Sequence, residues 1–150
     1  MEIMTKEDKA KAFFKEGYNC AQAVFLAFAD DLKMDENTVI KLTSSFGGGM
    51  GRLREVCGAV SGMFMVAGMF YGYTDPKATP AKTKHYRRIQ KLAGQFTDIH
   101  GSIICRDLLG LTVKTDSPAP ELRTAAYYRK RPCVQLVGDA ARLLDEMLQV

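Results

Sequence analysis

The stretch VCGAVSGMFMVAGMFYGY, residues 56–73, contains no charged residue and decides the fold. Its length is about the minimum for a membrane span, but four glycines and the hydroxyl groups of Ser61, Tyr71 and Tyr73 interrupt it. The segments on either side are amphipathic, and a helix that is apolar all round among amphipathic neighbours is typical of a buried core. The sequence therefore predicts a central, buried, glycine-rich helix over about residues 55–71 and no membrane span.

Helix start signals precede this stretch. Thr5, Asn19 and Asp35 each stand before an apolar pattern at helical spacing, and Asn19 has Gln22 at the capping-box position. A run of glycines at 47–49 ends the last of these patterns and leads toward the central helix. We therefore expect three helices before residue 47.

The apolar patterns that follow the central stretch predict further helices. A long helix ends at Gly101, a short helix is capped by Ser102, and a last helix opens at Pro132. The segment 111–120 reads as a loop, and its single strand-like pair is too short for a strand. The predicted fold is all-α: a compact, irregular bundle of about six or seven helices that forms a single domain over residues 1–150.

Composition narrows the class of protein. The 150 residues are 47% hydrophobic and 25% charged, which excludes a largely disordered chain. Four cysteines are too few for a disulfide-built scaffold, and a chain of this size does not need one. Residues 1–9 are charged and lack the apolar core of a secretory signal. We therefore expect a cytoplasmic protein whose cysteines serve catalysis or metal binding.

The four cysteines lie far apart in the sequence, at Cys20, Cys57, Cys105 and Cys133. Each follows a predicted cap, a proline or the glycine-rich run, so each is predicted in the first turn of a helix. Free backbone N–H groups and the positive end of the helix dipole favour a thiolate there. If these helix starts converge, they form a pocket suited to thiolates.

Two glycines accompany Cys57 in the central stretch. Gly58 and Gly62 stand one turn apart, although each glycine costs a helix about 1 kcal/mol relative to alanine. Such a cost implies a compensating role. Close approach of another helix is one such role, and access of a cofactor or substrate to the backbone is another.

These features resemble a known family. The quoted segments are GYNCAQAV at 17–24, FGGGMG at 46–51 and CGAVSG at 57–62, and the lone Cys105 and Cys133 complete the set. Their order and spacing are similar to the redox-active family named for its C-GCAxxG-C-C motif, over about residues 14–133. One departure is that the glycine follows Cys57 here, as CGAxxG. The resemblance implies a small, helical, redox-active protein, and related domains occur beside cytochrome modules that carry an iron–sulfur site.

The first hypothesis for function is a cofactor site. Four thiolates from Cys20, Cys57, Cys105 and Cys133 suit an iron–sulfur cluster or zinc. Zinc is less favoured because no two cysteines are closely spaced. Gly58 and Gly62 would lie beside the cofactor, and the function would be electron transfer or redox sensing.

The second hypothesis is thiol–disulfide chemistry without a cofactor. Cys57 would be the nucleophile, with its pKa lowered by Arg52 and Arg54, and Cys20 would resolve the mixed disulfide. Either hypothesis requires a redox partner protein or a small-molecule electron donor or acceptor. The sequence does not decide between an oxidoreductase and an electron-transfer protein, and it leaves a homo-oligomer open.

The third hypothesis is a binding module without redox chemistry. Basic residues cluster at 82–91 and at 129–131, but no nucleic-acid recognition motif accompanies them, so a solvated helix face is the favoured interpretation. Each cysteine taken alone also fits a small buried apolar residue. Of the two histidines, His85 is expected in solvent and His100 at a helix end.

Overall fold

The computed structural model describes residues 3–149, and within this range the chain is helical apart from loops and one isolated bridge between Val56 and Ile104. The helices are α1 (Lys6–Lys15), α2 (Cys20–Leu26), α3 (Ala29–Leu32), α4 (Glu36–Thr43), the short 3-10 helix η1 (Ser44–Phe46), α5 (Gly47–Met50), α6 (Gly58–Tyr71), α7 (Thr79–His100), α8 (Cys105–Leu109), α9 (Ala125–Lys130) and α10 (Cys133–Leu148). The all-α prediction is confirmed. Met1, Glu2 and Val150, which the single-domain prediction includes, lie outside the described residues.

The predicted start signals before α6 begin real helices. The side chains of Thr5, Asn19 and Asp35 cap α1, α2 and α4 by accepting backbone N–H groups. At α2 the capping box is complete: Asn19 Oδ1 accepts the Gln22 N–H at 2.9 Å, and Gln22 Oε1 accepts the Asn19 N–H at 2.9 Å. Each such cap is worth about 1 kcal/mol, so local chemistry fixes where these helices begin.

The central helix α6 starts three residues later than predicted, at Gly58, because the preceding segment follows a tight non-helical path. Its first half is buried as expected, whereas Met69 and Phe70 near its end are 53% and 37% exposed. The helix is therefore enclosed only at the end that carries Cys57. Among residues 3–149, no helix combines the length and apolarity needed to cross a membrane.

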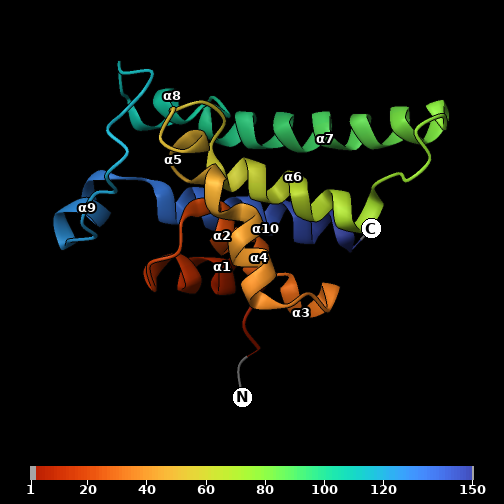
Figure 1. Cartoon of the computed structure of the whole chain (residues 1–150), viewed down its shortest axis with the longest axis horizontal. Coiled ribbons are helices and arrows are strands. Elements are labelled where there is room, and N and C mark those ends of the chain that lie inside the picture. Colours follow the sequence, from red (N-terminus) through yellow and green to blue (C-terminus); the bar gives the residue numbers. More distant parts are fainter. Residues whose placement is uncertain (1–2, 150) are drawn as a thin grey trace.

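The other long helices surround α6. α2, α7 and α10 pack against it, and α1 packs against α10 and α2. Figure 1 shows that α6 and α10 both start at the end of the molecule where α5, α8 and α9 gather. The core between them contains large, fully buried side chains such as Phe25, Phe96 and Leu144, each of which contributes about 1.5–3 kcal/mol by burial.

Further local expectations differ from the structure. Ser102 is not the cap of α8; Ile104 occupies that position, and the Ser102 hydroxyl accepts its N–H at 2.9 Å. Helix α9 was not predicted, because its six residues are too short for an apolar period to show. The segment 111–120 is a loop, as expected.

Candidate redox site

Each cysteine stands at the start of a helix. Cys20, Cys105 and Cys133 are the first residues of α2, α8 and α10, and Cys57 is the N-cap residue of α6. The predicted placement of the cysteines is thus confirmed. Each of these helix starts places the positive end of a helix dipole near a thiol, which favours negative charge there.

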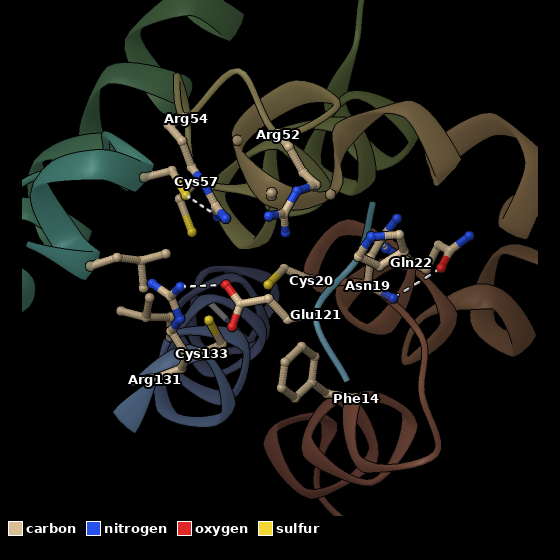
Figure 2. A pocket seen from close by; sticks show the side chains of 18 of the residues that line it. Phe14, Asn19, Cys20, Gln22, Arg52, Arg54, Cys57, Glu121, Arg131 and Cys133 are labelled. Carbon is tan, nitrogen blue, oxygen red and sulfur yellow. Dashed lines mark hydrogen bonds and ion pairs between the residues drawn. The ribbon is translucent and has the colours of Figure 1, made fainter. Parts of the chain in front are cut away.

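These helix starts converge on one cavity of about 420 Å³, which all four cysteines line (Figure 2). Cys20 is half-buried, whereas Cys57, Cys105 and Cys133 are buried. The cavity lies at the end of the bundle where α6 and α10 begin, so residues separated by more than a hundred positions contribute to one wall.

The glycine-rich run forms a tight turn in this wall. Residues Gly48 to Arg52 all have left-handed backbone, with φ between 60° and 71°. A Cβ atom at Gly49 would lie 2.6 Å from Cβ of Cys105 and 2.8 Å from Cα of Arg54, so only glycine fits. The turn packs against Cys105 at the start of α8. The Cys105 N–H also donates to the Glu55 carbonyl at 2.6 Å.

The two glycines of α6 allow α2 to approach closely. A Cβ at Gly58 would lie 2.8 Å from the Phe46 carbonyl oxygen and 3.1 Å from Cβ of Cys20, and a Cβ at Gly62 would lie 2.9 Å from the Ala21 carbonyl oxygen. Gly58 lines the cavity, whereas Gly62 lies under α2. Close helix packing therefore accounts for both glycines, and it brings Cys20 toward the start of α6.

Cys133 has the surroundings that most favour a thiolate. The Cys20 thiol donates a hydrogen bond to it, and with Arg131, the Tyr127 hydroxyl and Arg123 this holds the pKa of Cys133 at about 7, against the opposing effect of burial. The same hydrogen bond, together with burial, raises the pKa of Cys20 well above its usual range.

The other two thiols are held neutral. Burial raises the pKa of Cys57 to about 12, and the N–H groups of Ala59 and Val60 oppose this only in part. Arg54, expected beside Cys57, instead places Nη1 3.6 Å from Sγ of Cys105. Burial outweighs this contact and raises the pKa of Cys105 as well.

A segment between α8 and α9, residues 111–124, borders the cavity, and we call it the strap. Asp116 of the strap accepts from Arg54 Nη2 at 2.9 Å and lies 3.3 Å from Arg52 Nη2. Arg52 Nε also donates to the Ser117 carbonyl. Arg54 and Arg52 hold the pKa of Asp116 below its usual value, so the carboxylate stays charged.

The strap is attached at its other end as well. Glu121 accepts from Arg131 Nη2 at 2.6 Å. Arg123 donates to the carbonyl oxygens of Phe14 at 2.7 Å and Tyr18 at 2.9 Å, with its guanidinium 4.0 Å from the centre of the Phe14 ring. Figure 2 shows Arg131 and Glu121 beside Cys133.

Sequence reasoning missed several of these residues. Arg131 belongs to the basic cluster at 129–131 that was expected in solvent, but it is only 9% exposed. Its position directly before Pro132 and Cys133 was the available signal. Arg123 and the strap carboxylates gave no signal, because loop residues have no periodicity, and Tyr127 gave none because α9 is too short to show one.

The histidines lie away from the cavity. The expectation that His85 is solvated is wrong: it is 9% exposed on α7, and its Nδ1 has no hydrogen-bond partner among the described residues. His100 lies at the end of α7 as expected, where Nε2 is 2.9 Å from Oδ2 of Asp139. Neither histidine lines the cavity.

The four thiols also have the chemistry of a metal site. Four cysteines around one cavity are a donor set that suits an iron–sulfur cluster or zinc. Within residues 3–149, however, no three His, Cys, Asp or Glu side chains are arranged to hold a metal ion.

The fold and the site together define a small helical protein in which four cysteines, each at the start of a helix, border one cavity. The family model described as "Putative redox-active protein (C_GCAxxG_C_C)" matches residues 18–147, and the chain belongs to this family. The resemblance noted from the sequence is thus confirmed. No curated protein and no solved structure matched the chain.

Proposed function

We propose that this protein is a thiol redox protein in which Cys133 attacks a disulfide and Cys20 resolves the product. The observation that carries the proposal is that Cys20 and Cys133 line the same cavity together with Arg131, where hydrogen bonding with Cys20 and the positive charge of Arg131 lower the pKa of Cys133. A pair of adjacent thiols, one of them poised as a thiolate near neutral pH, is what thiol–disulfide exchange requires.

The reaction consists of two exchange steps. The Cys133 thiolate attacks one sulfur of a disulfide RS–SR, the S–S bond breaks, and RS⁻ leaves. Cys20 then loses its proton to solvent and attacks the Cys133 sulfur of the mixed disulfide, which releases the second RS⁻. The protein ends with a Cys20–Cys133 disulfide, and two electrons have reduced RS–SR to two thiols. A redox partner protein or a small-molecule donor then returns two electrons.

The proposal replaces Cys57 with Cys133 as the nucleophile. A thiol whose pKa is raised to about 12 is almost entirely protonated at neutral pH, and the protonated form is not the nucleophile. Cys133 combines a pKa of about 7 with two nearby arginines that stabilise negative charge on sulfur. Cys20 keeps the resolving role expected from the sequence.

The test is disulfide trapping. We expect the reduced protein, given one equivalent of bis(2-hydroxyethyl) disulfide, to release two mercaptoethanol molecules and to yield a Cys20–Cys133 linked peptide by mass spectrometry. Cys20→Ser should stop at mercaptoethanol attached to Cys133. Cys133→Ser should react at least tenfold more slowly, since the remaining thiols are mostly protonated.

Cys57→Ser is the matched control, because it also removes one cavity thiol but should leave the exchange rate within about twofold. Mercaptoethanol trapped on Cys57 in the Cys20→Ser variant would overturn the assignment of the nucleophile. Absence of any intramolecular disulfide in the unmodified protein would overturn the proposed function.

A second candidate function is an iron–sulfur centre for electron transfer or redox sensing. It is favoured by one observation: all four thiols border the same cavity, whereas exchange uses only two. Cys20, Cys57, Cys105 and Cys133 would be the ligands, with Gly58 beside them, and Gly62 would act through helix packing. Arg54 and Arg131 would then offset the negative charge of the thiolates.

A further inference from the structure

The arginines around the cavity outnumber the carboxylates that pair with them. Arg52, Arg54, Arg123 and Arg131 line the cavity, and every cationic side chain in its wall is an arginine. Their carboxylate partners among the described residues are Asp116 and Glu121. Four positive groups against two negative ones leave an excess of two positive charges.

The excess can be placed on particular residues. Arg131 is matched by Glu121, whereas Arg52 and Arg54 share the single carboxylate of Asp116. Arg123 donates to backbone carbonyl oxygens, which carry no net charge. One surplus charge therefore belongs to the Arg52–Arg54 pair and the other to Arg123.

The strap shows how these guanidinium groups bind carboxylates. Arg54 Nη2 lies 2.9 Å from the Asp116 carboxylate, within the range of charge-assisted hydrogen bonds, and Arg131 Nη2 lies 2.6 Å from that of Glu121, which is slightly shorter than this range. Arg52 is the more weakly engaged partner of Asp116, at 3.3 Å. Arg52 and Arg123 thus have donor capacity left for a ligand.

We propose that the cavity binds small disulfides that carry a carboxylate on each half, and that Arg52 and Arg123 determine this preference. The inference rests on the proposed function and names its substrate class. The surplus positive charge of the Arg52–Arg54 pair and that of Arg123 provide one cationic group for each of the two carboxylates of the substrate.

The size and lining of the cavity agree with such a ligand. A volume of about 420 Å³ lies within the range of small-molecule sites. Phe14, Leu108, Leu136 and Pro118 supply apolar wall for a short aliphatic chain. The cavity therefore combines an apolar lining with charged groups that orient a ligand.

The experiment compares three short aliphatic disulfides that differ in charge. Reduced protein is mixed with dithiodipropionate (a dianion), bis(2-hydroxyethyl) disulfide (neutral) or cystamine (a dication), and formation of the Cys20–Cys133 disulfide is timed. We expect the dianion to react about tenfold faster than the neutral compound and the dication to react slowest, because charge-assisted hydrogen bonds from arginine favour carboxylates.

Arg52→Gln tests the assignment, because Arg52 contacts Asp116 and Ser117 rather than a cysteine. The variant should lose about fivefold in rate with the dianion relative to the neutral disulfide, so the ratio of the two rates is the quantity compared. Arg87→Gln, which removes an exposed charge from α7, is the matched control and should leave the preference unchanged.

A binding measurement separates the inference from the redox proposal. Thiodipropionate has the same two carboxylates on a thioether that cannot exchange, and calorimetric titration should show binding that Arg52→Gln and Arg123→Gln both weaken. Equal rates for all three disulfides, or no binding of thiodipropionate, would overturn the inference alone. Failure of even the neutral disulfide to oxidise the protein would overturn the proposed function.

Discussion

Cys133 combines burial with a charge environment that opposes the usual effect of burial. Hydrogen bonding from Cys20 and the field of Arg131 hold its pKa at about 7, below the ordinary 9.0. Its reaction with iodoacetamide should therefore rise with pH and reach half its limit near pH 7. The measurement is the rate of Cys133 alkylation from pH 5 to 10, read by peptide mass spectrometry.

A matched pair of variants tests whether Arg131 causes the lowered pKa of Cys133. Arg131→Gln should move the midpoint for Cys133 upward, because loss of a nearby positive charge disfavours the thiolate. Arg129→Gln removes the same charge from an exposed position two residues away and should leave the midpoint unchanged. If neither variant shifts the midpoint, Arg131 does not lower the pKa of Cys133.

Cys57 affects the pH dependence of stability, because its pKa is raised and not lowered. Burial raises its pKa to about 12, so the neutral thiol stabilises the fold below the unfolded-state value near 9, and this contribution is lost as the pH rises toward 12. The free energy of unfolding in urea should fall between pH 9 and 12. Cys57→Ala should show a shallower fall, and an identical slope in both proteins would contradict the assignment.

The glycines of α6 allow a test of how closely α2 packs against this helix. Gly62→Ala gains about 1 kcal/mol in helix propensity, but its Cβ would lie 2.9 Å from the Ala21 carbonyl oxygen and 3.1 Å from Cβ of Val24. Overpacking of this kind costs about 1–3 kcal/mol, so we expect a net loss of about 1 kcal/mol in the free energy of unfolding.

Gly68 in the same helix is the control, because a Cβ there meets nothing within 4 Å. Gly68→Ala should be neutral or stabilise the protein by up to about 1 kcal/mol. Chemical denaturation of both variants gives the comparison. Equal stability changes would mean that close approach of α2 does not explain Gly62.

The start of α2 and the partner of Arg54 show which parts of the site can be predicted from the sequence. Asn19 and Gln22 form a cap whose members lie three residues apart, so the start of α2, and with it the position of Cys20, could be predicted. The partners of Arg54 could not: Asp116 is 62 residues away in a loop without periodicity. Local signals therefore placed the cysteines, whereas the arginines around them depend on tertiary structure.

In the molecule as a whole, the bundle gathers four helix starts at one end and surrounds their thiols with arginines. This arrangement raises the question of how many thiols act. Exchange requires Cys20 and Cys133, while Cys57 and Cys105 remain neutral in the wall. A cluster would use all four as ligands.

The number of essential cysteines therefore distinguishes the two functions. We expect protein purified without oxygen to be colourless, with iron and sulfide well below one per chain. Cys57→Ser and Cys105→Ser should then form the Cys20–Cys133 disulfide at a rate within about twofold of the unmodified protein, whereas Cys20→Ser and Cys133→Ser should form no such disulfide. A chelator should change nothing, because the two-thiol pathway contains no metal. Charge-transfer bands with matched iron and sulfide, lost equally in all four variants, would instead establish the cluster, since a ligand set fails when any member is removed.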